Sequence, residues 1–141
     1  VLTETDYGNY PVFKNNRCLI SEKKDGILYF GYIDKTGKKV IQTKFLNALN
    51  FNDNVALALE ILSQSRGNND ILDKPIVNYK YFEVTIDTEG KVKQYLNPEG
   101  INIVLDKKFL KNPPKITSKR ISDDLVATPN KNNKWVIKSI K

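Results

Sequence analysis

Histidine and methionine are both absent from this chain of 141 residues, and cysteine and tryptophan occur once each. Without histidine, the chain lacks the commonest general base and the commonest metal ligand. A single cysteine, Cys18, excludes an internal disulfide and leaves the redox compartment undetermined. No apolar run approaches the roughly 20 residues of a membrane-spanning helix. We therefore expect no membrane span, no metal site, no cofactor and no catalytic residues.

Positive charge is concentrated in the C-terminal part of the chain. Residues 101–141 hold ten basic and three acidic residues, 10 − 3 = +7, which equals the net charge of the whole chain. The first hundred residues then hold 23 − 10 = 13 basic and 16 − 3 = 13 acidic groups and are neutral. Such an asymmetry can mark contact with nucleic acid or an anionic surface. A solvated lysine-rich surface is the simpler interpretation, because charge alone specifies no partner.

Short runs rich in Tyr, Phe, Ile and Val alternate with Gly, Asn, Asp and Pro, which is typical of strands separated by tight turns. This spacing favours hairpins over βαβ units. We predict a mainly all-β fold of short antiparallel β-hairpins in a single domain over residues 1–141. The clearest predicted strands lie at 28–33, 79–86, 101–105 and 135–140.

One segment, residues 55–66 (VALALEILSQSR), fits two structures. Asp53 or Asn54 could cap a short helix that ends before Gly67. Periodicity does not separate a buried strand from a helix in so short an apolar run. We favour a strand over residues 55–61, and the short helix remains the alternative.

The sequence Asp34-Lys-Thr-Gly37-Lys predicts a hairpin turn. Asp34 can accept a backbone N–H two residues on, and Gly37 can take the left-handed conformation that a β-carbon resists. A phosphate-binding loop would instead need Gly-Lys-Ser/Thr between a strand and a helix. The same pattern returns at Asp87 and Gly90, where Glu89 would repel a phosphate. We therefore interpret these four residues as structural turn residues.

A second element occurs three times: an apolar anchor, a polar turn of Asn, Asp or Ser, and a short apolar strand. It begins at Phe13, Phe51 and Ile121, which divides the chain into repeat-like units at about 13–50, 51–120 and 121–141. Such small units cannot bury their apolar faces alone, so we expect them to stack. The side chains expected in the shared core are Tyr29, Phe30, Phe45, Phe51, Phe82, Phe109, Ile121 and Trp135.

The run from Phe30 to Ile41 (FGYIDKTGKKVI) resembles the core of bacterial WG repeats, with Phe30 where tryptophan is usual. Phe45, Ala48 and residues 51–57 continue the resemblance. The second copy departs from it at Glu83, and the third breaks off after Trp135. The resemblance implies a bacterial interaction module of stacked β-units, with a periplasmic or secreted location favoured and a cytoplasmic one left open. The start at Val1 fits a processed mature chain or a piece of a longer one.

Two candidate nucleophilic or acidic groups have structural explanations. Cys18 occupies a strand position that Ala56 and Val126 take in the other copies, so we expect a small buried side chain rather than a nucleophile. Asp123 and Asp124 fall in the polar anchor turn, where turn hydrogen bonding explains them better than proton transfer. We therefore predict a non-enzymatic protein.

The predicted function is protein binding, as an inhibitor, an immunity-type protein or an envelope-associated adaptor. A basic loop at 107–120 could complement an acidic partner, although a solvated connector explains it equally well. Binding of nucleic acid or an anionic surface through the same stretch is the alternative. It is the less favoured one because Phe109 is the only aromatic residue there. Oligomerisation is left open. The candidate partner-binding residues are Lys107, Lys108, Lys111, Lys115, Lys119 and Arg120.

Overall fold

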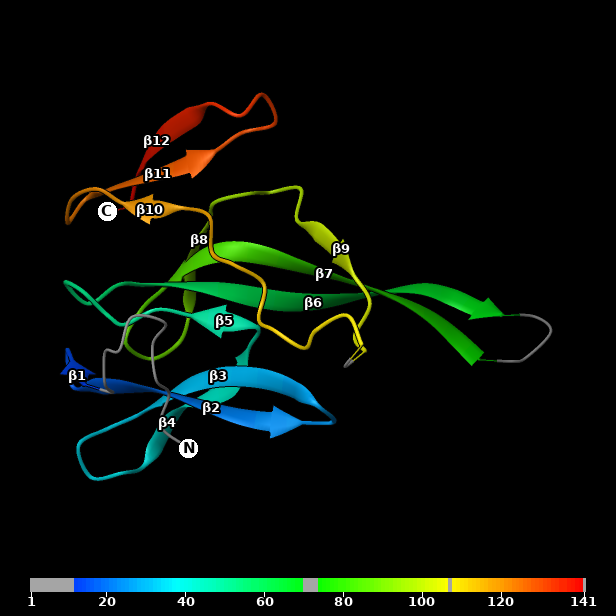
Figure 1. Ribbon diagram of the computed structural model, residues 1–141, viewed down its shortest axis with the longest axis horizontal. Helices are drawn as coiled ribbons and strands as arrows, with labels where there is room; N and C mark the ends of the chain where they lie inside the picture. The colour runs from blue at the N-terminus through cyan, green and yellow to red at the C-terminus, as the bar shows by residue number, and fades with distance from the viewer. Residues whose placement is uncertain (1–11, 70–73, 107, 141) are drawn as a thin grey trace.

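The computed structural model describes residues 12–69, 74–106 and 108–140, and over these ranges it contains β-strands and no helix. Every strand pairs antiparallel with its neighbours. This confirms the predicted all-β fold. The strands form three sheets, which Figure 1 shows one above another, with the first at the bottom and the third at the top.

The first sheet has the order β1-β2-β3-β4. A register shift interrupts the pairing of β3 with β4 on either side of Tyr32. At Gly31 a β-carbon would lie 2.4 Å from the carbonyl oxygen of Ile41, so only glycine fits there. The strands are β1 (Phe13–Lys14), β2 (Arg17–Lys24), β3 (Ile27–Ile33) and β4 (Lys39–Phe45).

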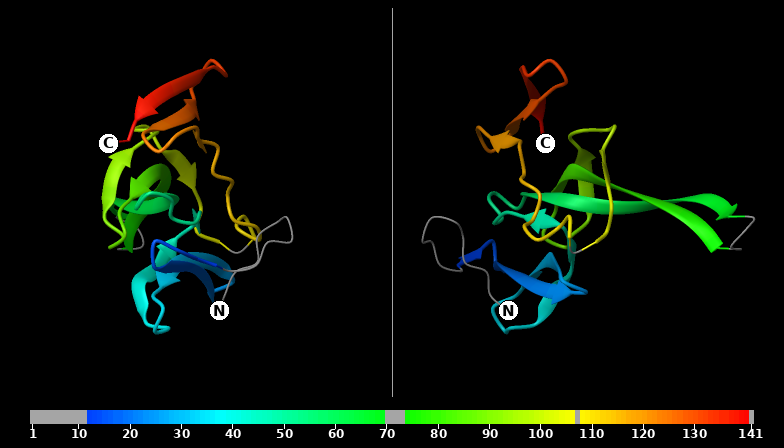
Figure 2. Two further views of the ribbon diagram at one scale, coloured as in Figure 1. Left: turned by 90° about the vertical axis from the view of Figure 1, so that its left-hand side faces the viewer. Right: turned by 45° about the vertical axis from the view of Figure 1, so that its right-hand side comes forward.

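The second sheet has the order β5-β6-β7-β8, and β9 pairs with another part of β7. Its two long strands form a hairpin that projects from the side of the molecule in Figures 1 and 2. The strands are β5 (Asn47–Ala48), β6 (Ala56–Asn69), β7 (Lys74–Ile86), β8 (Val92–Tyr95) and β9 (Ile101–Ile103).

The third sheet is the smallest, with the order β10-β11-β12. The β11–β12 hairpin pairs Leu125 with Ser139 at one end and Pro129 with Trp135 at the other. The strands are β10 (Lys119–Arg120), β11 (Leu125–Pro129) and β12 (Trp135–Ser139).

Residues 56–66 of the ambiguous segment belong to strand β6, and Val55 forms an antiparallel bridge with Asn52 just before it. Ala56 pairs with Ile86 and Ile61 with Tyr81, so the strand prediction for 55–61 is confirmed and the helix is excluded. The strand also runs further than predicted, to Asn69. A strand is favoured over a helix here because pairing with the aromatic run of β7 gives hydrogen-bond partners to the backbone N–H and C=O groups of both apolar segments.

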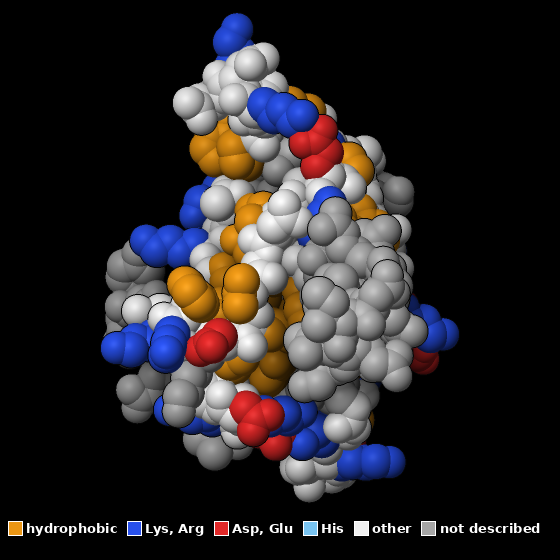
Figure 3. Space-filling model, turned by 90° about the vertical axis from the view of Figure 1, so that its right-hand side faces the viewer, with side chains coloured by type: hydrophobic (Ala, Val, Ile, Leu, Met, Phe, Trp, Pro, Cys, Tyr) orange, Lys and Arg blue, Asp and Glu red, His pale blue; other side chains and the backbone are white. Residues whose placement is uncertain are grey.

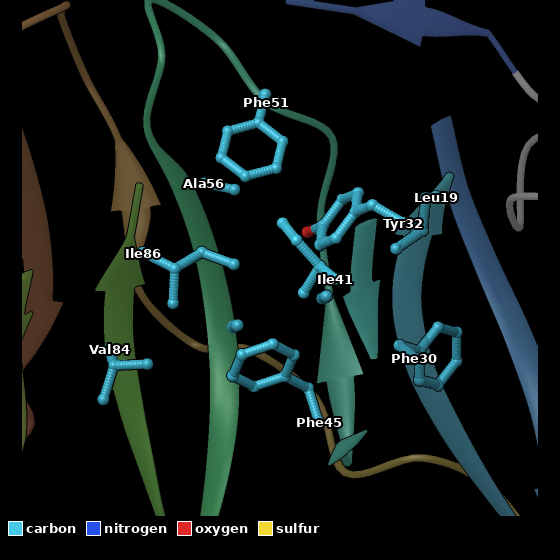
Figure 4. Packing of buried hydrophobic residues seen from close by; sticks show 11 residues of the cluster. Leu19, Phe30, Tyr32, Ile41, Phe45, Phe51, Ala56, Val84 and Ile86 are labelled. Carbon is cyan, nitrogen blue, oxygen red and sulfur yellow. The ribbon is translucent and has the colours of Figure 1, made fainter. Parts of the chain in front are cut away.

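A shared core joins the first and second sheets. Figure 4 shows Tyr32, Ile41 and Phe45 of the first sheet directed toward Val84 and Ile86 of the second. The phenol of the fully buried Tyr32 donates to the carbonyl oxygen of Leu49 at 2.6 Å, so no polar group is stranded there. The buried residues of this core are Leu19, Phe30, Tyr32, Ile41, Phe45, Ala48, Phe51, Ala56, Ala58, Val84 and Ile86.

A smaller core joins the second and third sheets. Val55, Leu57 and Leu96 of the second sheet region pack with Val126 and Ile140 at the third sheet. The expected aromatic core is only partly correct. Phe30, Phe45 and Phe51 are buried, and Phe82 packs partly buried beside them. Tyr29 is also partly buried, against a separate cluster.

Three side chains expected in the core lie at the surface instead. Phe109 is 70 % exposed, Trp135 59 % and Ile121 51 %. The core prediction is wrong for these residues because the third sheet has a described neighbour on one side only, and because Phe109 lies in the connection that leads to that sheet.

Candidate functional site

Three hairpin turns share one hydrogen-bond pattern. In the turn at 34–38, Oδ1 of Asp34 accepts the backbone N–H groups of Thr36 and Lys38 at 2.9 and 3.1 Å, and Gly37 has φ +87°. In the turn at 87–91, Asp87 accepts from Glu89 and Lys91 at 2.9 and 3.0 Å, and Gly90 has φ +85°. The hydrogen bonds from Thr36 and Lys38 hold the pKa of Asp34 below its usual range, with the Thr36 hydroxyl as the largest cause.

The Pro129-Asn130 dipeptide is a turn signal and predicts the third turn, but not that this turn shares the pattern of the other two. Oδ1 of Asn130 accepts the N–H groups of Asn132 and Lys134 at 2.9 and 3.0 Å, and Asn133 has φ 59° in the glycine position. Asparagine can replace both residues because its side-chain oxygen accepts like a carboxylate and its backbone tolerates the left-handed region. The Asp-x-x-Gly signal was therefore too narrow.

Turns of the first and second sheets contact one another. Nε of Arg17 donates to the carbonyl oxygen of Thr88 at 2.8 Å. A β-carbon on Gly90 would lie 2.9 Å from Cγ2 of Ile41, so the second turn rests against the first sheet. The turn residues therefore act at the interface between sheets as well as within their own hairpins.

Residues 108–118 connect Asp106 to the third sheet, and together with Lys119, the first residue of β10, they are here called the basic strap. Its exposed lysines are Lys108, Lys111, Lys115 and Lys119, whereas Lys107 lies outside the described residues. Leu110, between two of these lysines, is buried against Ile27, Leu46 and Leu59. Nδ2 of Asn47 donates to the carbonyl oxygen of Pro114 at 2.8 Å. Leu110 and Pro114 thus attach the basic strap to the first two sheets, while its lysines are exposed to solvent.

A buried carboxylate fixes the C-terminal end of the strap. Glu83 on β7 is 5 % exposed and accepts four hydrogen bonds. The backbone N–H groups of Thr117 and Ser118 donate to it at 2.8 and 3.0 Å, and both hydroxyls donate at 2.5 Å. Oγ of Ser118 also lies 2.8 Å from Oγ1 of Thr128 on β11. Glu83 therefore links the second sheet, the strap and the third sheet.

Arg120 is bound within the protein. Nη1 donates to the carbonyl oxygens of Asn52 and Val55, at 2.5 and 3.0 Å. Nε and Nη2 donate to the carbonyl oxygens of Ser122 and Asp123 at 3.3 and 3.0 Å. Because its guanidinium joins two anchor turns, Arg120 is left out of the candidate partner-binding set, which keeps Lys108, Lys111, Lys115 and Lys119.

A pocket of about 240 Å³ lies between the loop at 96–99 and the β11–β12 hairpin. Both lysines that line it have partners within the protein. Lys131 forms an ion pair with Glu99 at 2.6 Å, and Nζ of Lys138 donates to the carbonyl oxygen of Leu96 at 2.7 Å. The pocket therefore offers few free polar groups to a small ligand.

Reactive groups are few over the described ranges. Cys18 is buried, as predicted, and burial raises the pKa of its thiol, which disfavours the nucleophilic thiolate. Burial likewise raises the pKa of Tyr32. Among residues 12–69, 74–106 and 108–140, no cluster of three or more Cys, Asp or Glu side chains could hold a metal ion.

Comparison of the chain with protein-family models, curated proteins and solved structures finds no match. Within the described residues, no helix is long and apolar enough to cross a membrane.

Sequence reasoning noted Glu83 only as a departure from the repeat and missed the structural role of Arg120. A carboxylate inside the aromatic-aliphatic run Tyr81-Phe82-Glu83-Val84 was the available signal, since a charged residue is rarely buried without partners. No comparable local signal marks its partners Thr117 and Ser118, which lie 34 and 35 residues further along the chain.

Proposed function

We propose that the chain is a non-enzymatic protein-binding module of the WG-repeat type. In this proposal it is an inhibitor, an immunity-type protein or an envelope-associated adaptor, and the basic strap contacts an acidic partner. One observation carries the proposal: Glu83, Leu110 and Pro114 fix the backbone of the strap, whereas its lysines are exposed. A segment that is already ordered loses less conformational entropy when it binds.

The lysine spacing supports electrostatic attraction of an acidic protein. Lys108, Lys111 and Lys115 are exposed along one ordered segment, and the strap contains no acidic residue. Clustered charge of one sign accelerates encounter with a partner of the opposite sign and selects against like-charged partners. The absence of histidine and the burial of Cys18 favour binding over catalysis.

Binding of nucleic acid or an anionic surface is the second candidate. Phe109, 70 % exposed and beside Lys108, is the feature that favours it, since exposed aromatic rings stack on bases. Phosphate binding weakens steeply as salt rises, whereas a packed protein interface weakens less.

The test compares two triple variants in pull-downs from soluble and envelope fractions of the source organism, at physiological and raised salt. The strap variant replaces Lys108, Lys111 and Lys115 with Gln. The control variant replaces Lys23, Lys35 and Lys38, three exposed lysines of the first sheet region, and therefore removes the same charge. We expect a stoichiometric protein partner that survives raised salt and is lost only with the strap variant. Capture that washes away with salt, or that both variants reduce equally, contradicts the proposal.

A further inference from the structure

The third sheet has two faces of different exposure. On β12, Trp135 and Ile137 are 59 % and 61 % exposed. Ile140, which directly follows the strand, is 5 % exposed and packs in the core shared with the second sheet. On β11, Val126 is fully buried and Leu125 is 37 % exposed, whereas Ala127, which pairs with Lys119 and Ile137, is only 8 % exposed. Val136, on the other face of β12, is 38 % exposed and lines the pocket beside the loop at 96–99. Because side chains alternate between the faces of a strand, the odd-numbered residues share one face, here called the outer face.

The apolar residues of the outer face are neighbours across the strands. Trp135 pairs with Pro129 and Ile137 with Ala127. Ile121, 51 % exposed, directly follows β10, and its N–H donates to the carbonyl oxygen of Leu125 at 3.0 Å. Figure 3 shows hydrophobic atoms at the surface of the uppermost part of the molecule, where the third sheet lies. Contiguous exposed apolar side chains of this kind mark interaction surfaces.

The other sheets bury apolar residues in cores shared within the chain. The second sheet packs Ala58 and Val84 against the first sheet and Leu57 against the third. In the first sheet, Leu19 packs in the shared core, and Cys18 and Ile20, which alternate with it on β2, are also buried. Among the described strand residues, the two most exposed large apolar side chains, Ile137 and Trp135, both lie on the outer face of the third sheet.

Charge selects the occupant of this face. Residues 108–140 hold eight basic and two acidic residues, 8 − 2 = +6. Lys119 lies on the outer face opposite Ala127, and Lys134 directly precedes Trp135. A second copy of the chain, also carrying +7, would be repelled. Nucleic acid would gain little from Ile137 and Leu125, because recognition of single strands rests on cations and stacked aromatic rings.

The geometry points to the outer face of the third sheet as a docking surface for an acidic protein segment with alternating apolar residues. The apolar side chains of that segment cover Trp135 and Ile137, and its carboxylates meet Lys119 and Lys134. This inference rests on the proposed protein-binding function and extends it from the strap to the adjoining sheet.

Trp135 is the only tryptophan of the chain and reports on this face directly. The probe is a capped peptide of alternating Val and Glu, without tryptophan. Three comparison ligands are a Val–Lys peptide, a Ser–Glu peptide and a single-stranded DNA oligonucleotide. We expect the Val–Glu peptide alone to shift Trp135 emission to the blue and to protect it from acrylamide quenching.

The variant Ile137→Ser tests the apolar contact, and Leu62→Ser, which alters an apolar residue 44 % exposed on β6, is its control. We expect Ile137→Ser to weaken binding about tenfold or more and Leu62→Ser to leave it unchanged. Thermal unfolding verifies that both variants fold. Anisotropy of a labelled peptide gives affinity independently of tryptophan emission.

Several outcomes overturn the inference. Binding that leaves Trp135 emission unchanged and is insensitive to Ile137→Ser places the partner elsewhere and leaves the proposed function standing. If the DNA oligonucleotide shifts Trp135 emission as much as the Val–Glu peptide does, the outer face binds nucleic acid instead. If Trp135 emission without any ligand changes with protein concentration, the outer face binds a second copy of the chain. Absence of peptide binding also overturns it. Failure of the proposed function is distinct, because it appears as the loss of salt-resistant protein capture in the pull-down.

Discussion

The backbone N–H of Ser118 donates to Oε1 of Glu83 over 3.0 Å, joining the end of the basic strap to β7 across 35 residues of chain. The carboxylate is 5 % exposed, and its four donors come from two consecutive residues, Thr117 and Ser118. Buried carboxylates are tolerated only when they are fully hydrogen-bonded. The Glu83 carboxylate therefore stabilises the fold and holds the C-terminal end of the basic strap against β7.

Replacing Glu83 with Gln is expected to destabilise the protein by about 2–3 kcal/mol, because the new amide group faces donors and leaves them unsatisfied. Urea denaturation measures the change. Glu89→Gln, at an exposed turn position, is the matched control and should leave the midpoint unchanged. Equal midpoints for the parent and Glu83→Gln would show that the carboxylate does not hold the strap.

Replacing Arg120 with Lys keeps the charge but loses the planar fork that reaches Asn52, Val55, Ser122 and Asp123. We expect a loss of about 1–3 kcal/mol, since carbonyl oxygens lose charged donors. Thermal unfolding tests this, with Lys119→Gln as the exposed neighbour that should melt like the parent. If Lys119→Gln lowers the melting temperature more than Arg120→Lys does, the hydrogen bonds of Arg120 between the two anchor turns do not stabilise the fold.

The two turn glycines should differ in their response to alanine. Gly37 has no atom within 4 Å of the added β-carbon, so only the left-handed backbone opposes the change, at about 1–2 kcal/mol. Gly90 adds a contact with Ile41 at 2.9 Å, which should cost about 1–3 kcal/mol more through overpacking. Gly37→Asn should be milder than Gly37→Ala, because Asn133 already holds φ 59° at that turn position. Chemical denaturation of the three variants, measured in parallel, ranks their free energies of unfolding.

Acid should weaken the fold through Asp34 and Glu22. The Thr36 hydroxyl lowers the pKa of Asp34, and Lys39 lowers the pKa of Glu22. A carboxyl group with a lowered native pKa stabilises the protein above its unfolded value of about 4, and this contribution is lost as the pH falls through the native pKa.

Asp34→Asn isolates the charge, since Asn130 makes the same two turn hydrogen bonds in the third turn. We expect this variant to retain the fold and to show a shallower loss of stability below about pH 4. Denaturation midpoints as a function of pH measure it. An acid slope identical to that of the parent would mean that Asp34 does not contribute to acid sensitivity.

The sequence predicted the all-β class because its signals are local. Alternating apolar runs and turn residues specify strands and hairpins within a few residues of each other. The strand predicted at 55–61 is confirmed by the pairing of Ala56 with Ile86. Asparagine in place of Asp and Gly concealed the likeness of the turn at Asn130 to the two Asp-x-x-Gly turns, although its hydrogen bonds follow the same pattern.

What the sequence could not specify depends on contacts between distant segments. Trp135 has a large apolar side chain of the kind usually found in a core, but it is 59 % exposed because no described segment covers that face of the third sheet. Glu83 meets Ser118, and Arg120 meets Asn52, across 35 and 68 residues. The sequence shows the excess of basic residues in 101–141, but not that the guanidinium of Arg120 donates to backbone carbonyl oxygens of the protein itself.

The two cores are unequal, and this has a dynamic consequence. Eleven buried residues join the first and second sheets, whereas five join the second to the third. Local opening draws on the region with the least buried apolar contact, so amide hydrogens of 119–140 should exchange first while the first two sheets open together. A partner that binds only the closed third sheet slows that exchange in proportion to its occupancy. The surface proposed for recognition is thus also the part of the molecule whose local stability a partner would change most.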